Sequence, residues 1–190
     1  MNNKDIKNNL IKIAIKELMK DNWDNLDINF MSKKLKVSSE KVLSVCTSKN
    51  DLLDMWSNNI NYEMFRNISH EELKEASIKD RLLEIMLCRF DVLSSKSKEV
   101  NALVKLSKSN LIESKKSLIR IYNAMELICN LAGISTNGKK GIIKVKALLI
   151  IWLLVFREWY KTGMNSEDIL LSHLDKNLIL AEKLRNIVFN

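Results

Sequence analysis

Apolar residues recur every three or four positions along most of this chain, which is the spacing of one buried face of a helix. No stretch alternates strictly between apolar and polar residues, as a half-buried strand would. The chain also has no proline and only four glycines, so few positions interrupt a helix. We therefore expect an all-α protein with about nine helices. The predicted helices span residues 4–20, 28–36, 39–46, 48–69, 78–93, 98–107, 112–131, 142–161 and 166–188.

Two short helical segments lie close together between Asp27 and Leu53, with a tight polar break between them. Ser38 is expected to cap the second segment, and a longer helix begins near Ser48. This arrangement is typical of a helix-turn-helix, which presents its second helix to a groove of DNA. The side chains expected to face inward are Met31, Leu35, Val42, Leu43 and either Val45 or Cys46.

The remaining helices are expected to build a body. Residues 1–48 are predicted to be a DNA-binding domain and residues 49–190 a dimerisation domain, for which the family resemblance given below also implies ligand binding. Residues 67–75 are predicted to be a loose connector, and 135–140 a loop. The helix over 142–161 is apolar on nearly every side, and a monomer could cover only one of its faces. This favours a homodimer that pairs the helices near 142–161 and 166–188.

Charge and composition indicate the kind of partner and the compartment of the protein. The net charge of +8 fits a nucleic acid or an anionic membrane surface, and ten lysines against six acidic residues fall in the first 50 positions. The most apolar run, Ala147 to Phe156, is about half the length that a bilayer span needs. Cys46, Cys88 and Cys129 form no CxxC pair, which favours free thiols in a reducing compartment. We therefore expect a cytoplasmic protein.

No catalytic constellation stands out in the sequence. It has no Ser-His-Asp spacing, no glycine-rich phosphate loop and no HExxH motif. The chain is therefore not expected to be an enzyme, and no metal or other cofactor is expected.

The N-terminal pattern resembles the DNA-binding head of the tetracycline-repressor (TetR) family. The stretches that carry the resemblance are LIKIAIKELM at 10–19, DINFMSKKLKVSSEKVLSV at 27–45 and SKNDLL at 48–53. The match departs from the family at Leu43, where an aromatic residue that touches phosphate is usual, at Cys46, where Phe is usual, and at Lys36, where the turn usually has Gly. The resemblance implies a dimer that binds double-stranded DNA and is controlled by a small apolar effector held in the helical body.

A second resemblance runs through the body. It lies in Asp80-Arg81-Leu82, Arg89-Phe90-Asp91, Leu131-Ala132-Gly133-Ile134, Arg157-Glu158-Trp159 and Leu174-Asp175. These segments look like a set of alphaproteobacterial TetR-like proteins similar to the lipid-binding ubiquinone-biosynthesis family. Members of that family share the architecture but need not bind DNA. The alternative function is therefore a lipid- or quinone-binding protein without DNA binding.

Polar side chains of the helix-turn-helix are the candidates for DNA contact. Lysines and hydroxyls can hold phosphates, although Ser38 and Thr47 could equally be simple helix caps. No arginine precedes Arg66, so the head cannot make the common bidentate contact of arginine with guanine. The DNA-binding candidates are Asn29, Lys33, Lys34, Ser38, Ser39, Lys41, Ser44, Thr47 and Lys49.

Large apolar residues of the body are the candidates for an effector or lipid pocket. The same residues would serve equally well as plain core, which is the commoner role of such side chains. The six pocket candidates are Met86, Phe90, Tyr122, Met125, Trp152 and Trp159.

Overall fold

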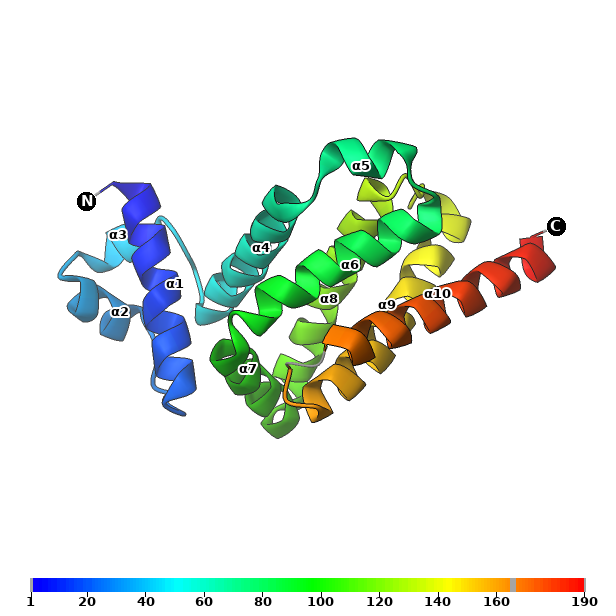
Figure 1. Ribbon diagram of the computed structural model, residues 1–190. Coiled ribbons are helices and arrows are strands. Elements are labelled where there is room, and N and C mark those ends of the chain that lie inside the picture. Colours follow the sequence, from blue (N-terminus) through cyan, green and yellow to red (C-terminus); the bar gives the residue numbers. More distant parts are fainter. Residues whose placement is uncertain (1, 165–166, 190) are drawn as a thin grey trace. The chain divides into compact units, whose positions relative to one another are not determined.

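The computed structural model describes residues 2–164 and 167–189, except for the side chains of His70, Glu72 and residues 184–189. Within these residues the chain is all-α, as predicted, with ten helices (Figure 1). Ser166, the predicted start of the last helix, lies outside the described residues. The helices are α1 (Asn3–Met19), α2 (Ile28–Leu35), α3 (Ser39–Leu43), α4 (Lys49–Asn67), α5 (His70–Glu75), α6 (Ile78–Ser94), α7 (Ser97–Ser109), α8 (Leu111–Leu131), α9 (Gly138–Lys161) and α10 (Glu167–Phe189).

Two of the predicted connections are wrong. The segment expected to be a loose connector contains the short helix α5. This helix raises the number of described helices from the expected nine to ten. Helix α9 begins at Gly138, inside the segment expected to be a loop. Its first turn lies against the backbone of Thr136, where a Cβ on Gly141 would be 2.0 Å from the Thr136 carbonyl carbon. Only glycine fits such a close approach. The sequence pattern does not indicate that the backbones of Thr136 and Gly141 come this close.

The chain divides into two compact units. The first contains Met1–Ile60 and Lys96–Lys116, and the second contains Asn61–Ser95 and Ser117–Asn190. The first unit carries 16 lysines against 10 acidic residues, a net charge of +6 out of the total of +8. This unit is larger than the predicted DNA-binding domain of residues 1–48, because α7 and the first part of α4 belong to it. The functional boundary at residue 48 stays a prediction.

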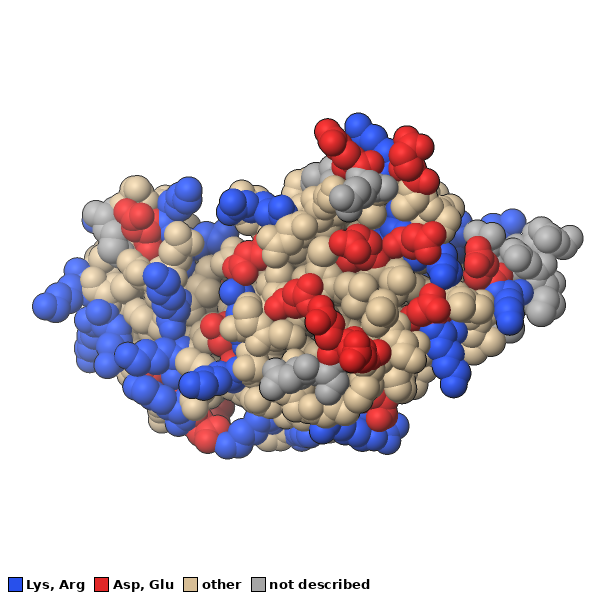
Figure 2. All heavy atoms as spheres, in the orientation of Figure 1, with Lys and Arg blue, Asp and Glu red and all other residues tan. Residues whose placement is uncertain are grey.

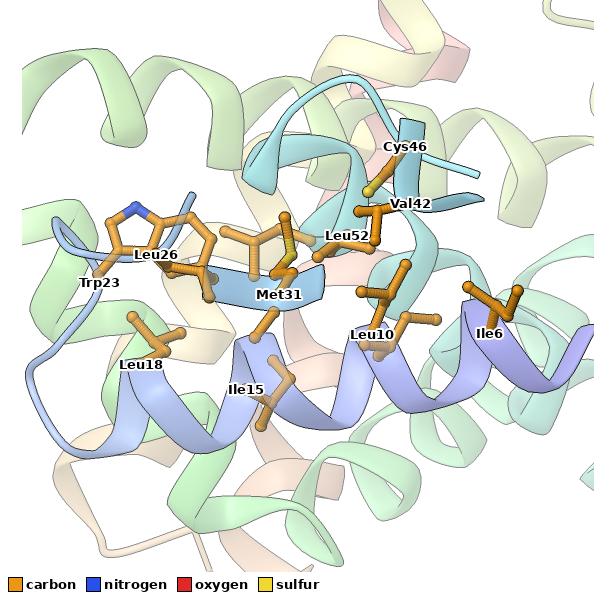
Figure 3. Packing of buried hydrophobic residues seen from close by; sticks show 13 residues of the cluster. Ile6, Leu10, Ile15, Leu18, Trp23, Leu26, Met31, Val42, Cys46 and Leu52 are labelled. Carbon is orange, nitrogen blue, oxygen red and sulfur yellow. The ribbon is translucent and has the colours of Figure 1, made fainter. Parts of the chain in front are cut away.

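The first unit is built around one apolar core. Leu10 of α1, Met31 of α2, Val42 of α3 and Leu52 of α4 are each fully buried in it, and Figure 3 shows their side chains directed toward one another. Trp23, from the loop between α1 and α2, closes one end of this core. Partly buried side chains of α7 pack against the same cluster. The core therefore holds α2 and α3 in a fixed arrangement on α1.

The second unit packs α6, α9 and α10 together. Phe90 of α6 stacks on Trp152 of α9 with ring centroids 4.3 Å apart, and meets Trp159 edge-on at 5.1 Å. Lys79 of α6 forms an ion pair with Asp175 of α10 at 2.8 Å. Across residues 2–164 and 167–189, none of the helices combines the length and apolar character that crossing a membrane requires.

Candidate nucleic-acid interface

Helix α2 begins and ends with local backbone signals. The Asp27 carboxylate accepts a hydrogen bond from the Phe30 amide at 2.7 Å, which caps the start of the helix. At the other end Lys36 has a φ of 55°, in the left-handed region, and the Val37 amide donates to the Ser32 carbonyl at 3.1 Å. A lysine in this conformation costs about 1 kcal/mol relative to glycine. The turn of the helix-turn-helix is therefore formed without the usual glycine.

Helix α3 is shorter than predicted. The predicted cap at Ser38 is confirmed, because its hydroxyl accepts from the Lys41 amide at 3.4 Å. The helix ends at Leu43, after five residues. Val42 and Cys46 are 0% and 2% exposed and fill the core, whereas Leu43 is 49% exposed. The inward orientation predicted for Leu43 is wrong. Val42 and Cys46, four residues apart, provide the side chains that face the core, and Leu43 lies on another face of the helix.

The start of α4 is fixed by a reciprocal capping arrangement. Asp51 accepts from the backbone amides of Thr47 at 2.7 Å and Ser48 at 3.1 Å, and the Ser48 hydroxyl accepts from the Asp51 amide at 3.4 Å. Burial opposes ionisation of Asp51, but the hydrogen bonds from Ser48 and Thr47 outweigh it and lower the pKa of this carboxyl. The Thr47 hydroxyl also donates to Asp51, at 2.8 Å, so it takes part in the cap.

Most of the DNA-binding candidates lie on the surface of the first unit. The exposed ones are Asn29, Lys33, Lys34, Ser38, Lys41, Ser44 and Thr47, and the half-buried ones are Ser39 and Lys49. All four of the hydroxyls already have partners, and those of Ser38 and Thr47 take part in the caps described above. The Ser39 hydroxyl donates to the Ser32 hydroxyl at 3.5 Å, and the Ser44 hydroxyl donates to the Lys41 carbonyl at 2.9 Å.

Lys49 is used inside the unit. Its ammonium donates to the Trp23 carbonyl at 2.6 Å and to the Asp24 carbonyl at 3.4 Å, and it lies 5.2 Å from the centre of the Trp23 ring. These contacts tie the loop between α1 and α2 to the start of α4. In this conformation the charge of Lys49 faces the loop.

Two exposed residues were not among the candidates. Lys36 lies at the turn between α2 and α3, and Leu43 ends α3. Lys36 could have been found from its position after the last apolar residue of α2, where a side chain leaves the helix and faces solvent. Figure 2 shows Lys and Arg side chains gathered over α2 on the displayed face. The surface of α2, the turn and α3 is therefore positively charged, with one apolar side chain at its end.

The six pocket candidates form packed core. Met86, Phe90, Met125, Trp152 and Trp159 are 0–2% exposed, and Tyr122 is half-buried. A pocket of about 300 Å³ opens elsewhere on the second unit, and none of the six lines it. Its lining residues are Glu84, Leu87, Cys88, Asp91, Glu167, Asp168 and Leu171. Acidic side chains gather over α6 and the start of α10 in Figure 2.

Burial shifts the pKa of titratable groups that line the acidic pocket. Burial, with the nearby charges of Glu167 and Glu84, raises the pKa of Asp91. Burial likewise raises the pKa of the Cys88 thiol to about 11, so the reactive thiolate is not formed near neutral pH. Among the residues that the structure describes, no group of three or more His, Cys, Asp or Glu side chains is placed to hold a metal ion.

Helix α9 carries an apolar stripe that the described part of the chain leaves uncovered. Ile143, Ile150 and Leu154 are 53%, 59% and 50% exposed. Together with exposed Ala147 they follow a 4-3-4 spacing, which places all four on one face of the helix.

Comparison with known proteins identifies the fold. No family model matches the chain, and no curated protein sequence matches it. Among solved structures, the chain is similar to the TetR transcriptional regulator from Nitrosomonas europaea, with a TM-score of 0.65 and 13% sequence identity. The similarity covers 93% of this chain and 97% of that chain. The protein therefore has a TetR-like, all-helical fold.

Proposed function

We propose that the protein is a homodimeric, TetR-like transcriptional regulator that binds double-stranded DNA. The observation that carries this proposal is the helix-turn-helix of residues 27–53. Its turn and both caps are formed, and its outer surface presents lysines and hydroxyls. The similar regulator from Nitrosomonas europaea supports it through the fold.

The charge distribution fits contact with the DNA backbone. Lysines that neutralise phosphates release counterions, and this supplies much of the affinity of such proteins for DNA. The first unit holds most of the excess positive charge, and Lys33, Lys34, Lys36 and Lys41 are all exposed around the turn. Lys41 is the only cation of α3. We therefore assign phosphate contact to the lysines of α2 and the turn, and contact with base edges to Lys41.

Leu43 has a complementary role in this proposal. It occupies the place where an aromatic, phosphate-touching residue is usual in the resembling family, and it is half exposed at the end of α3. A leucine there cannot donate a hydrogen bond to a phosphate. Its methyl groups can instead contact a thymine methyl in the major groove.

Binding to DNA is tested by fluorescence anisotropy with labelled DNA from upstream of the gene. We expect affinity to fall steeply between 50 and 200 mM salt, as is usual for proteins that make several phosphate contacts. Lys33→Ala should weaken binding and lower the salt slope by about 0.9. Lys139→Ala, an exposed lysine of the second unit, serves as the matched control and should bind as the wild type does. Absence of salt-dependent binding to any upstream segment would refute the function.

The proposed dimer uses the apolar stripe of α9. Four side chains with the spacing of a helix-pairing seam are exposed on one face, and a second copy of the same helix would cover them. A two-fold dimer would then carry two heads that contact operator half-sites about 34–36 Å apart. The homodimer and the use of α10 beside α9 belong to the proposal.

The dimer is tested by measuring mass in solution. Light scattering should give a dimer for the wild type and a monomer for Ile150→Glu, because the new charge would be buried in the apolar seam. Ile112→Glu changes an equally exposed isoleucine of α8 (63% against 59%) and is the control. A dimer that persists in Ile150→Glu would exclude this face.

The lipid- or quinone-binding alternative without DNA binding has one observation in its favour. The ammonium of Lys49 is engaged with backbone carbonyls, and α3 offers one lysine and no arginine, so the positive surface of the head is thin. Native mass spectrometry of freshly purified protein separates the two functions. A retained isoprenoid or phospholipid, combined with no DNA binding, would favour the alternative and the ubiquinone-biosynthesis subgroup.

A further inference from the structure

Arg89 lies in the core of the second unit. It belongs to α6 and is 4% exposed. Its guanidinium carbon is 5.4 Å from the centre of the Trp152 ring, and one terminal nitrogen, Nη1, donates a hydrogen bond to the side-chain oxygen of Asn61. The Nε–H group of Arg89 is buried and has no hydrogen-bond partner among the described residues. Part of the donor capacity of this arginine is therefore unused.

The charge of Arg89 is also unpaired. No carboxylate in the part of the chain that the structure describes forms an ion pair with it. Burial lowers the pKa of the guanidinium to about 10, so it remains protonated at neutral pH. Buried charges in proteins are normally paired, because removal of an ion from water costs several times what a neutral hydrogen bond returns. An unpaired buried cation is therefore an unusual feature that requires an explanation.

A second unused donor lies beside the first. The indole Nε1–H of Trp152 is buried and has no partner, and this is the same ring that faces the Arg89 guanidinium. Both groups can only donate hydrogen bonds, since neither guanidinium nor indole nitrogen accepts one. An anion could accept a hydrogen bond from either donor and would offset the positive charge. Asn61 satisfies only part of the arginine.

The surroundings of this pair are apolar and aromatic. Phe90 stacks on Trp152, and Phe156 lies 6.3 Å from Trp152 and 5.5 Å from Trp159 between ring centroids. An anion that reaches Arg89 must therefore be attached to an apolar body. Free phosphate or sulfate would gain nothing from these rings and would be expensive to desolvate.

We infer that Arg89 and Trp152 form the polar end of a binding site for a small organic carboxylate with an apolar body. A planar carboxylate can accept from Arg89 and Trp152 together, and arginine is the side chain best suited to hold it. Since these side chains are almost fully buried, the carboxylate enters by displacing part of the aromatic packing, which selects a minor, opened state.

A consequence for regulation follows from Asn61. It lies on α4, whose first residues belong to the compact unit that contains the helix-turn-helix. A carboxylate that competes with Asn61 for the guanidinium would change what holds α4 to α6. Carboxylate binding itself rests on the contacts of the second unit alone, but its role as the effector rests on the proposed function.

The test uses the full-length chain without DNA. Thermal unfolding and titration calorimetry are measured with sodium decanoate and sodium benzoate, and with decanol and benzyl alcohol as neutral partners of the same shape. We expect both carboxylates to raise the Tm of the wild type more than the matching alcohols do. Arg89→Met should bind decanoate at least about tenfold more weakly, since a charged hydrogen-bonded contact is lost.

Two further variants separate binding from folding. Trp152→Phe keeps the stack on Phe90 and removes the Nε1–H, and should weaken decanoate binding about threefold. Arg157→Met removes an exposed arginine of α9 and should leave binding unchanged. Without ligand, Arg89→Met should be at least as stable as the wild type, because it replaces an unpaired buried charge with an apolar chain.

Several outcomes would overturn the inference. These are carboxylates that stabilise the wild type no more than the alcohols do, or decanoate that binds Arg89→Met as tightly as the wild type. If Arg89→Met does not fold, the comparison of carboxylate with alcohol on the wild type and on Trp152→Phe decides the matter. Carboxylate binding without DNA binding would refute the proposed regulator and support the carboxylate site. DNA binding without carboxylate binding would support the regulator and refute the carboxylate site.

Discussion

The helix-turn-helix and the core around Arg89 differ in how the hydrogen bonds of their polar groups are satisfied. In residues 27–53 the caps come from neighbours three or four positions away, as with Asp27 and the Phe30 amide or Asp51 and the Thr47 amide. Around Arg89 the one hydrogen-bond partner, Asn61, lies 28 positions away, and two buried donors remain unpaired. The first region is locally complete, whereas the second holds buried donors for which we propose a ligand as the partner.

This difference shows where each region obtains its stability. Short-range caps hold α2, α3 and α4 in shape and fix the surface that we propose contacts DNA, even with a lysine in the left-handed turn position. In the second unit, side chains from segments far apart in the sequence meet, as Phe90 does with Trp152 and Lys79 with Asp175. A fixed contact surface and an adjustable core are what a ligand-controlled binding protein needs.

The largest expected effect comes from the close approach of the Gly141 Cα to the backbone of Thr136. Gly141→Ala would place a Cβ 2.0 Å from the Thr136 carbonyl carbon, and neither backbone segment can move without disturbing the start of α9. We expect a loss of about 3 kcal/mol in the free energy of unfolding, measured with urea. Gly163→Ala, with a φ of 77° but no atom within 4 Å of the new Cβ, should lose only about 1 kcal/mol. Equal losses for the two variants would contradict the dependence on the Thr136 approach.

Removal of the local cap on α4 should cost less. Asp51→Ala leaves the amides of Thr47 and Ser48 without their shared acceptor. The expected loss is about 1–2 kcal/mol, the usual range for a lost helix cap. Asp24→Asn, a change at an exposed acidic residue of the first unit, should stay within about 0.5 kcal/mol.

The cap of α4 also predicts a pH dependence. Because the pKa of Asp51 is lower in the folded protein than in the unfolded chain, its ionised form stabilises the fold. This stabilisation is complete above the unfolded pKa of about 4 and is lost as the pH falls through the folded value. Stability of Asp51→Asn should therefore decline less on acidification than that of the wild type. A parallel decline in both proteins would argue against the cap as the cause.

The sequence predicted the local features of this fold better than the tertiary ones. The cap at Ser38 could be predicted because a short polar residue precedes the apolar residues of α3. The orientation of Leu43 was not, because it depends on which of several nearby apolar residues reaches the core first. Helix α5 was missed since its segment is polar and lacks an apolar face.

In the candidate sites, too, local features could be predicted and tertiary contacts could not. Exposed polar residues of the helix-turn-helix could be named from the pattern, although the inward contact of Lys49 with the Trp23 carbonyl could not. Phe90 and Trp152 were named as pocket residues from their size alone. Their link to Arg89 was invisible, because periodicity shows that an arginine lies on an apolar helix but not which side chains of other helices surround it.

A buried charge that is paired provides the next contrast with Arg89, because Glu17 forms an ion pair with Lys20 at 3.5 Å. Glu17 is 6% exposed and accepts from the Asn22 side chain at 2.8 Å, and this hydrogen bond is the main cause of its lowered pKa. Asn22→Ala should raise the pKa of Glu17 and cost about 1 kcal/mol at neutral pH. The loss should shrink as the pH falls through the folded pKa, since protonated Glu17 no longer needs the donor. Asn25→Ala, which removes only an exposed bond to Asn22, is the control.

The smallest expected effect on stability is that of Leu43→Ala in α3. Val42 is fully buried and Leu43 is 49% exposed, although the sequence pattern predicted both to face inward. Leu43→Ala should change the free energy of unfolding by less than about 0.5 kcal/mol, whereas Val42→Ala should cost about 2 kcal/mol through the cavity it leaves. If Leu43 contacts a thymine methyl as proposed, its alanine variant should keep its stability and still lose affinity for upstream DNA. A variant that loses stability and affinity together would instead place Leu43 in the core, and the surface assigned to DNA would have to be turned about the axis of α3.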